Sequence, residues 1–529
     1  MTTHGPGRAL GRRSVLHGAA VASAALALPA AGGAPAVAAP GQIRAGRPRA
    51  AWGVQAGDVT SSSGVVWVRS DRPARMIVQT AATESFRNAR TWHGPLVGPG
   101  TDFTGRTALH GLPSGEQIHY RVVLADPDDY RRTSEPVAGT FRTAPVRRRE
   151  NVRFLWSGDL AGQGWGINPD LGGYRIYEEM RRRDPDFFLC SGDNIYADGP
   201  IAERVTLPDG RVWRNVITEE KAKVAETLAE YRGNFRYNLL DRHLRRFNAQ
   251  VPTIVQWDDH EVRNNWYPGQ ILDDARYTEK NVDVLAARAR RAFAEYFPLG
   301  TLRPDGQGRV YRVLRQGPLL DVFVLDMRTY RDANSPNRQP VDRGGILGGE
   351  QLRWLKRELS RSRAVWKVIA SDLPLGLVVA DGKTDFEAVA QGDPGAPLGR
   401  ELQIAELLRH IKHHRVTGTV WLTADVHYTS AQHYSPERAA FKDFAPFWEF
   451  VSGPLNAGGF PAVGLDGTFG PRQVFVKAPS RANVSPAEHP QFFGEVDIDG
   501  DSGELTVRLR EDGGGVLFSR TLQPGRVGQ

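Results

Sequence analysis

Six apolar, strand-like runs of the chain each lead into an aspartate. They are V-R-F-L-W-S-G before Asp159, D-F-F-L-C-S-G before Asp193, V-P-T-I-V-Q-W before Asp258 and Asp259, L-L-D-V-F-V-L before Asp326, V-W-K-V-I-A-S before Asp372, and T-V-W-L-T-A before Asp425. In α/β sheets ligands bind outside the strand ends, where the loops converge, so these carboxylates are expected to meet. Converging carboxylates repel one another unless a cation lies between them. The sequence therefore predicts a metal site.

The neighbours of four of these aspartates strengthen that prediction. Asp193 is followed by Asn-Ile-Tyr196, Asp259 by His260, and Asp425 by Val-His427. Residues two apart on an extended segment point the same way, so Asp425 and His427 are expected to bind a common centre. Asp159 is the fourth candidate metal ligand. Asp326 and Asp372 are as well suited to a turn or helix-capping role as to metal binding.

The donor atoms in this set indicate which cations fit and what chemistry they bring. Oxygen ligands with one or two imidazoles and no thiolate favour hard cations such as Fe3+, Ca2+, Mg2+ or Mn2+. Two such ions bridged by one carboxylate hydrolyse phosphoesters, because they lower the pKa of a shared water and neutralise charge on phosphorus.

The elements that must position these residues alternate between strand and helix. Amphipathic stretches of helical period lie between the apolar runs, at 174–183, 219–231, 284–297, 348–359 and 402–414. This alternation predicts a layered α/β domain over 147–529, with β-sheets flanked by helices. The segment 493–510 is expected to form a hairpin near the C-terminus.

A different pattern occupies residues 51–146. Short β-like runs alternate there with Gly, Pro, Ser and Asp turns, which predicts a β-sandwich. Its last stretch, with Leu109, Leu112, Gly115 and Tyr120, resembles the closing strands of a fibronectin type III-like domain.

The first 39 residues are typical of a targeting segment. The pair Arg12 and Arg13 precedes an apolar Ala/Leu stretch, and A-P-A-V-A-A ends at Ala39, which predicts a cleaved twin-arginine signal followed by a linker over 40–50. The mature protein is then expected outside the cytoplasm, secreted or periplasmic, after passage through the twin-arginine export machinery. No later segment is long and apolar enough to serve as a transmembrane anchor.

Charge and cysteine content narrow the function classes. The 529 residues carry a formal charge of +8, and removal of the three arginines of the signal would leave 8 − 3 = +5. The basic residues form no stripe interleaved with stacking aromatics, so a nucleic-acid partner is not expected. Cys190 is the only cysteine and lies in the apolar run F-F-L-C, where a buried small hydrophobe is expected rather than a nucleophile. Oligomeric state is not predicted.

Four ordered motifs resemble one family. W-D-D-H-E-V-R-N-N-W from Trp257, S-G-D-N-I-Y from Ser191, L-D-M-R-T-Y-R-D from Leu325 and A-D-V-H from Ala424 are similar to motifs of the alkaline phosphatase D (PhoD-like) metallophosphatases. The opening A-W-G-V-Q-A-G-D resembles the N-terminal domain of that family, in which a twin-arginine signal is also usual. The resemblance extends over nearly the whole chain.

The resemblance implies a role for each site residue. Asp193 would bridge two metals, Tyr196 and His427 would complete an Fe3+ site, and Asp259, Asn265 and Asp425 would hold a second cation, usually Ca2+. Asp159 stands where family members often have a cysteine ligand, and since aspartate is harder than thiolate the identity of the first metal stays open. His260 would contact the phosphate and protonate the leaving oxygen. Apart from the resemblance, Arg328 and Arg331 are candidate phosphate clamps, because a guanidinium can stabilise the phosphoryl oxygens.

The predicted function is a secreted, metal-dependent phosphoester hydrolase, an alkaline phosphatase acting on monoesters, diesters or both. The predicted mechanism is direct, in-line attack on phosphorus by a hydroxide held between the metals. One alternative is a phosphodiesterase or phospholipase D-type enzyme that acts on lipid head groups or wall polymers. Another is a secreted binding protein that uses metals only for stability, which would leave His260 without a task.

Overall fold

Two β-sheets packed face to face carry all six of the strands that lead into aspartates. The computed structural model describes residues 46–147, 149–342 and 345–525. In the first sheet the strands lie in the order β24-β23-β22-β8-β9-β12-β1-β2-β5, and in the second in the order β13-β14-β15-β18-β20-β19-β21. Four strands of the second sheet are β13 (Arg312–Arg315), β19 (Thr429–Tyr434), β20 (Phe447–Val451) and β21 (Pro471–Lys477). The strands that precede the aspartates are β8 (Val152–Ser157), β9 (Phe187–Ser191), β12 (Thr253–Gln256), β14 (Leu320–Val324), β15 (Trp366–Ala370) and β18 (Thr419–Thr423).

Alternating side chains of these strands form separate cores on their two faces. Phe154, Leu189 and Ile254 of the first sheet pack with Val322, Val368 and Val420 of the second in one core between the sheets. The residues next to them in sequence point outward, toward helices. Strands buried on both faces are apolar throughout, which is why these runs stand out in the sequence.

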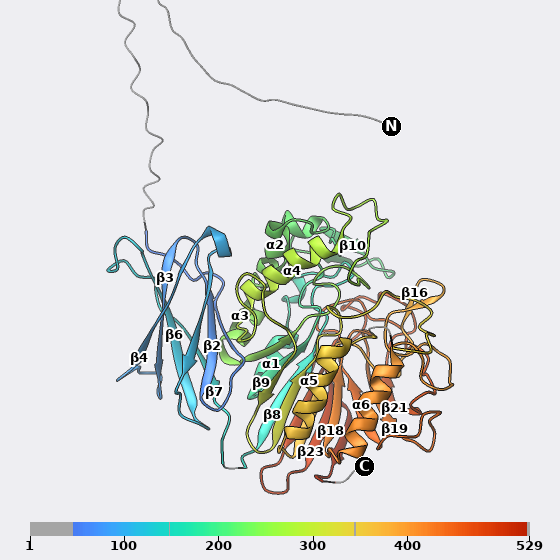
Figure 1. The fold of residues 1–529 in the computed structure, drawn as a ribbon. Coiled ribbons are helices and arrows are strands. Elements are labelled where there is room, and N and C mark those ends of the chain that lie inside the picture. The colour runs from blue at the N-terminus through green and yellow to red at the C-terminus, as the bar shows by residue number, and fades with distance from the viewer. Residues whose placement is uncertain (1–45, 148, 343–344, 526–529) are drawn as a thin grey trace, which may run out of the picture. The chain divides into compact units, whose positions relative to one another are not determined.

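Helices cover the outer face of each sheet. The first sheet packs against α1 (Ile176–Arg182), α2 (Leu228–Asn238), α3 (Arg242–Gln250) and α4 (Val282–Tyr296), and the second against α5 (Gly348–Arg361) and α6 (Glu401–His413). The result is a layered helix–sheet–sheet–helix arrangement (Figure 1), which confirms the predicted layered α/β class.

One predicted helix differs from the observed one. Residues 219–231 were expected to form a continuous helix, but only Glu220–Ala222 form a short 3-10 turn, and α2 begins at Leu228. Thr227 caps α2: its side chain accepts from the backbone N–H of Glu230, and the Glu230 carboxylate accepts from the Thr227 N–H. This capping box fixes the start of the helix.

The predicted β-sandwich is present, and one of its two sheets continues into the α/β part of the chain. The sheet β4-β3-β6-β7, formed by Arg90–Val97, Ala74–Ala81, Gln117–Ala125 and Val137–Arg142, packs on β1 (Val54–Gly57), β2 (Ser63–Arg69) and β5 (Thr104–His110). β1 pairs in parallel with β12, through Gly57 and Thr253. A Cβ at Gly57 would lie 2.6 Å from the carbonyl oxygen of Thr253, so this junction requires glycine. Because both parts share one sheet, the boundary at 146/147 stays a prediction.

The remaining expectations concern the two ends of the chain. β22 (Phe492–Ile498) and β23 (Leu505–Glu511) form the predicted hairpin, and β24 (Val516–Leu522) extends it. The predicted signal, 1–39, lies outside the described residues. No helix among the described residues is long and apolar enough to cross a membrane.

Candidate metal centre

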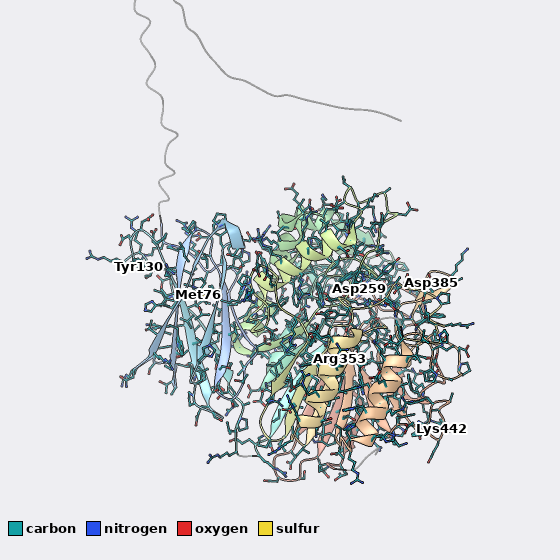
Figure 2. The ribbon with its side chains drawn as sticks, viewed as in Figure 1. Met76, Tyr130, Asp259, Arg353, Asp385 and Lys442 are labelled. Carbon is teal, nitrogen blue, oxygen red and sulfur yellow. The ribbon has the colours of Figure 1, made fainter. Side chains whose placement is uncertain are left out.

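The seven aspartates that follow the six strands collect where the carboxyl ends of the two sheets meet. β8, β9 and β12 are parallel in the first sheet, and β14, β15 and β18 are parallel in the second. Asp259 is labelled at this end of the strands in Figure 2. Among the described residues, three groups have ligand atoms within 4.8 Å of one another: Asp159 with Asp193 and His427, Asp193 with Asp259 and His260, and Asp258 with Asp259 and Asp425.

The backbone around these groups is held in an unusual conformation. Left-handed φ values between +48° and +71° occur at Asp159, Ala161, Gln163, Asp193, Asn265, Asp425 and His427. Such a cluster of non-glycine residues is typical of functional sites, where the surrounding fold holds strained geometry in place. This conformation contradicts the expectation that Asp425 and His427 bind a common centre from an extended segment. Both residues lie beyond the end of β18 in a left-handed turn, and they belong to different groups.

The first group presents an imidazole and two carboxylates to one point. His427 Nδ1 lies 2.7 Å from the carbonyl oxygen of Gly458, which can only accept, so Nδ1 carries the proton and Nε2 carries the lone pair. Nε2 accepts from the Tyr196 hydroxyl at 2.8 Å and lies 3.8 Å from Asp159 Oδ1. Burial lowers the pKa of His427 to about 4, so the ring is neutral at neutral pH and suited to bind a cation.

Asp159 supplies the test of whether a metal fits there. Both of its carboxylate oxygens are buried and have no hydrogen-bond partner in the protein, and burial raises the pKa of this carboxyl to about 8. Unpaired buried carboxylate oxygens are costly, and a bound cation removes that cost. The residues present therefore fit a cation.

The group of Asp258, Asp259 and Asp425, called the second group from here on, also contains a buried carboxylate oxygen without a hydrogen-bond partner. Asp259 Oδ2 accepts from the backbone N–H of Asn265 at 2.5 Å, whereas its Oδ1 is buried without a hydrogen-bond partner. Asp258 joins this group, although the motif comparison gave it no ligand role. The sequence feature that could have indicated a ligand role for Asp258 is the pair D-D, because both aspartates directly follow one strand.

His260 lies beside both groups and is oriented by a residue that sequence reasoning missed. Its Nδ1 lies 2.6 Å from Oδ1 of Asp198, and its backbone N–H donates to Asp193 Oδ1 at 3.1 Å. Burial lowers the pKa of His260, but Asp198, Asp259 and Asp193 outweigh this effect and raise it well above the ordinary value. The ring is thus held as a proton donor next to the carboxylates.

Arg328 is placed differently from the expected phosphate clamp. Its side chain has no exposed surface, and its guanidinium contacts the carboxylates of Asp258, Asp372, Glu387 and Asp425. The N–H groups thus point at carboxylates of the protein rather than at an open site. A guanidinium at this point neutralises two members of a metal group, Asp258 and Asp425, together with Asp372 and Glu387.

Arg331 is also buried, but it is less fully paired. One of its Nη2 contacts is with the Asn334 side chain at 3.1 Å and another with the backbone carbonyl of Glu387. Its Nε and Nη1 are buried without a hydrogen-bond partner. The clamp role of Arg331 stays a prediction.

Glu261 joins the two main ligand loops, a role that was not predicted from the sequence. Its carboxylate accepts from the backbone N–H groups of Asp193, Asn194 and Asp258, and from the Asn194 amide. The ends of β9 and β12 are therefore tied through one buried side chain.

The two aspartates left open by the sequence have different surroundings. Asp326 accepts from Trp257 Nε1 and from the backbone N–H and hydroxyl of Thr329, so it has a structural role. Asp372 lies 3.3 Å from Arg328 Nε and has buried oxygens without hydrogen-bond partners. It belongs to the carboxylate cluster around Arg328.

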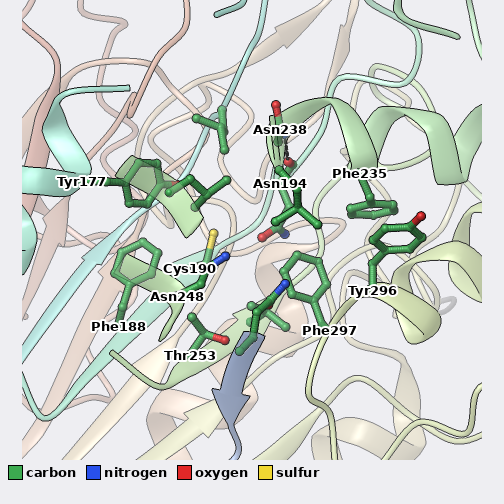
Figure 3. Close-up of a pocket in the computed structure, with 15 residues that line it drawn as sticks. Tyr177, Phe188, Cys190, Asn194, Phe235, Asn238, Asn248, Thr253, Tyr296 and Phe297 are labelled. Carbon is green, nitrogen blue, oxygen red and sulfur yellow. Dashed lines mark hydrogen bonds between the residues drawn. The ribbon is translucent and has the colours of Figure 1, made fainter. Parts of the chain in front are cut away.

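Cys190 lies in the core between the first sheet and its helices. Its thiol lines a cavity of about 50 Å³ together with Phe188, Tyr296 and Phe297 (Figure 3). None of the residues in the three metal groups lines this cavity. Burial raises the pKa of the thiol well above its ordinary value, so Cys190 behaves as the buried small hydrophobe expected from the sequence.

Comparison with known proteins gives the family. Residues 154–509 match the model of the PhoD-like phosphatase family, and residues 35–145 match the model of its N-terminal domain. The chain belongs to the PhoD-like phosphatase family. Like that family, it is a hydrolase that acts on phosphoric ester bonds.

Individual relatives agree with this assignment. Alkaline phosphatase D of Bacillus subtilis (strain 168) is 28% identical over 473 residues, which cover 84% of this chain and 73% of the relative. A solved structure of PhoD matches with a TM-score of 0.66 at 22% identity, over 90% of this chain and 94% of that one. A purple acid phosphatase, PPD1 from yellow lupin (Lupinus luteus) seeds, matches with a TM-score of 0.54 at 12% identity, over 90% and 74%. These two structures share the fold of this PhoD-like phosphatase.

Proposed function

We propose that this PhoD-like phosphatase is a secreted enzyme that hydrolyses phosphoesters directly with two cations, without a covalent intermediate on the protein. Asp159, Tyr196 and His427 would hold the first cation, and Asp259, Asn265 and Asp425 the second, with Asp193 shared between them. To this set we add Asp258. When bound, the cations lower the pKa of a water and neutralise the phosphoryl oxygens.

One observation carries the proposal. Both oxygens of Asp159 and Oδ1 of Asp259 are buried without hydrogen-bond partners, and each of these residues belongs to a group of ligands within 4.8 Å. Buried carboxylates without partners are unfavourable in a protein that binds no cation there. A surface acidic cluster would instead be hydrated.

His260 supplies the proton in this proposal. A ring nitrogen of His260 lies within 4.8 Å of carboxylate oxygens of Asp193 and Asp259, so the imidazole borders the space where the ester would bind. Asp198 on Nδ1 leaves Nε2 as the atom that gives a proton to the leaving alkoxide. Arg328 has no clamp role here, because its donors are occupied by carboxylates.

The metals and the location are further parts of the proposal. The Tyr196 hydroxyl beside His427 Nε2 favours a trivalent ion such as Fe3+ at the first site, and the all-oxygen second group favours Ca2+. Elemental analysis of the purified protein tests both assignments. Export by the twin-arginine route is tested by replacing Arg12 and Arg13 with Lys and locating the protein by fractionation.

The central experiment measures p-nitrophenol release from a phosphate monoester and from the matching diester. The parent is assayed before and after chelation, with Asp193→Asn as the variant. Metal-dependent turnover that Asp193→Asn abolishes supports the proposal, and the monoester-to-diester ratio decides between phosphatase and phosphodiesterase action. No turnover of either ester by metal-loaded protein would refute it and favour the binding-protein alternative.

A further inference from the structure

A short hairpin far along the chain contacts, through Asp381, the side chain of Asn265, whose backbone N–H donates to Asp259. The hairpin consists of β16 (Ala380–Asp381) and β17 (Asp385–Phe386). Asp381 Oδ1 accepts from the amide nitrogen of Asn265 at 2.9 Å, and Oδ2 accepts from the amide nitrogen of Asn334 at 2.8 Å. The first of these contacts joins residues 116 positions apart.

Asn265 is held at three points, and two of them are its backbone groups. Its N–H donates to Asp259 Oδ2 at 2.5 Å, and its carbonyl oxygen accepts from Asn334 Nδ2 at 3.0 Å. The main chain there is left-handed, with φ +58°. The backbone of Asn265 is thus fixed beside Asp259, and only rotation of the side-chain amide remains to be set.

Asp381 decides how that amide is turned. An amide has one face that donates and one that accepts, whereas a carboxylate only accepts. The NH2 group of Asn265 must therefore face Asp381, and Oδ1 must point the other way. A hard cation binds the amide oxygen and is repelled by the NH2 group, so the amide of Asn265 is useful as a ligand in only one of its two orientations.

The rest of the network keeps Asp381 in place. Asn334 Oδ1 accepts from Arg331 Nη2 at 3.1 Å and from Arg400 Nη2 at 2.8 Å, which fixes the Asn334 amide with its nitrogen toward Asp381. Arg400 is the N-cap residue of α6. A continuous chain of hydrogen bonds therefore runs from α6 through Asn334 and Asp381 to Asn265.

We propose that Asp381 is a positioning residue: it turns the Asn265 amide so that its oxygen, rather than its nitrogen, faces the cation held with Asp259. This inference rests on the proposed function, because it assumes a cation in the second group. Residues that hydrogen-bond to a metal ligand and set its orientation contribute to metal affinity, and their loss typically lowers that affinity about 10–100-fold.

The test measures Ca2+ affinity by titration calorimetry, with Mn2+ measured in the same way, and thermal unfolding of the metal-free protein. Asp381→Asn offers both a donor and an acceptor, so the Asn265 amide can turn over. We expect affinity to fall about 10–100-fold while the unfolding temperature of the metal-free variant stays near that of the parent. Asp385→Asn is the matched control, since it removes the same charge from the same hairpin without a contact to Asn265, and it should bind as the parent does.

The swap Asp381→Asn with Asn265→Asp separates orientation from mere loss of a contact. It keeps the hydrogen bond with donor and acceptor exchanged, and the carboxylate at 265 presents oxygen whichever way it turns. We expect the swap to restore most of the affinity. If Asp381→Asn misfolds, Asp381→Ala with and without Asn265→Asp gives the same comparison.

The outcomes distinguish this inference from the proposed function. If the parent binds cations and hydrolyses esters but Asp381→Asn binds as tightly, only the role of Asp381 is overturned. The same holds if the swap binds no better than Asp381→Asn alone. If the parent binds neither cation and hydrolyses neither ester, the proposed function fails and this inference with it.

Discussion

The Nδ1 atom of His260 lies 2.6 Å from Oδ1 of Asp198, and Asp198 Oδ2 accepts from the backbone N–H of Asn264 at 2.8 Å. One carboxylate therefore fixes the imidazole and the loop that follows it. Because Nδ1 is bound to an acceptor, the ring can deliver a proton only from Nε2. The pair makes His260 a directed proton donor rather than a free loop histidine.

Asp198→Asn is expected to slow hydrolysis of esters with poor leaving groups. The amide no longer holds the imidazolium, so general-acid catalysis, which contributes about 10²–10⁴-fold, is largely lost for an alkyl phosphate. p-Nitrophenolate leaves with little help from a proton, so its turnover should fall much less. The kcat values for glycerol phosphate and p-nitrophenyl phosphate measure this difference. Asp209→Asn, at an exposed pair with Arg211, is the control, and equal losses for both esters would contradict the proton-donor role.

Arg328 is expected to be essential for stability. Its fully buried guanidinium contacts four carboxylates, and removal of one partner from a buried ion pair typically costs about 3–5 kcal/mol. Arg328→Lys keeps the charge but offers a single nitrogen, which cannot reach carboxylates on several sides. The unfolding temperature should fall strongly in Arg328→Lys and hardly at all in the exposed Arg353→Lys. Unchanged stability with weaker substrate binding would instead support the phosphate-clamp role.

The strand ends could be predicted from sequence because the information is local. A strand buried on both faces is a continuous apolar run, and an aspartate directly after it must lie at the carboxyl edge of the sheet. Six such runs were enough to predict where the carboxylates meet. The start of α2 was missed, although the capping-box spacing of Thr227 and Glu230 was present in the sequence.

The parts that could not be predicted depend on contacts between distant segments. Asp381 reaches Asn265 across 116 positions, and Arg328 reaches Asp258 across 70, so no local pattern shows either pairing. Arg328 has the same residue type as a phosphate clamp, and only its burial distinguishes the two roles. The expected common centre for Asp425 and His427 failed because the chain turns after β18 instead of continuing as a strand.

Glu261→Gln tests whether the two ligand loops depend on one side chain. The carboxylate accepts from three backbone N–H groups and one amide, but glutamine has a single oxygen and would point an NH2 group at a donor. Each buried N–H left without an acceptor costs about 1–3 kcal/mol. We expect lower stability and weaker Ca2+ binding together. Glu279→Gln, whose carboxylate accepts from the nearby backbone N–H of Asn281 in an exposed turn, is the control. Full stability and affinity in Glu261→Gln would show that the loops are held by other contacts.

Glu449 on β20 (Phe447–Val451) lies outside the three metal groups and is expected to make stability depend on pH. Burial raises the pKa of Glu449 to about 7, even though Tyr434 and the backbone N–H of Leu375 donate to its carboxylate. A carboxyl whose pKa is raised by folding contributes stability below its unfolded pKa, and that contribution is lost as pH rises through about 7.

Glu449→Gln removes this pH dependence, because glutamine is neutral throughout. Relative to the parent, the variant should therefore gain stability between pH 5 and pH 8, by a difference on the order of 3 kcal/mol. Unfolding temperatures of both proteins at the two pH values measure it, with the exposed Glu406→Gln as the control. The amide can accept from the Leu375 N–H and donate to the Tyr434 hydroxyl, so both contacts are kept in the variant. A stability difference that is the same at both pH values would show that Glu449 ionises normally in the folded protein.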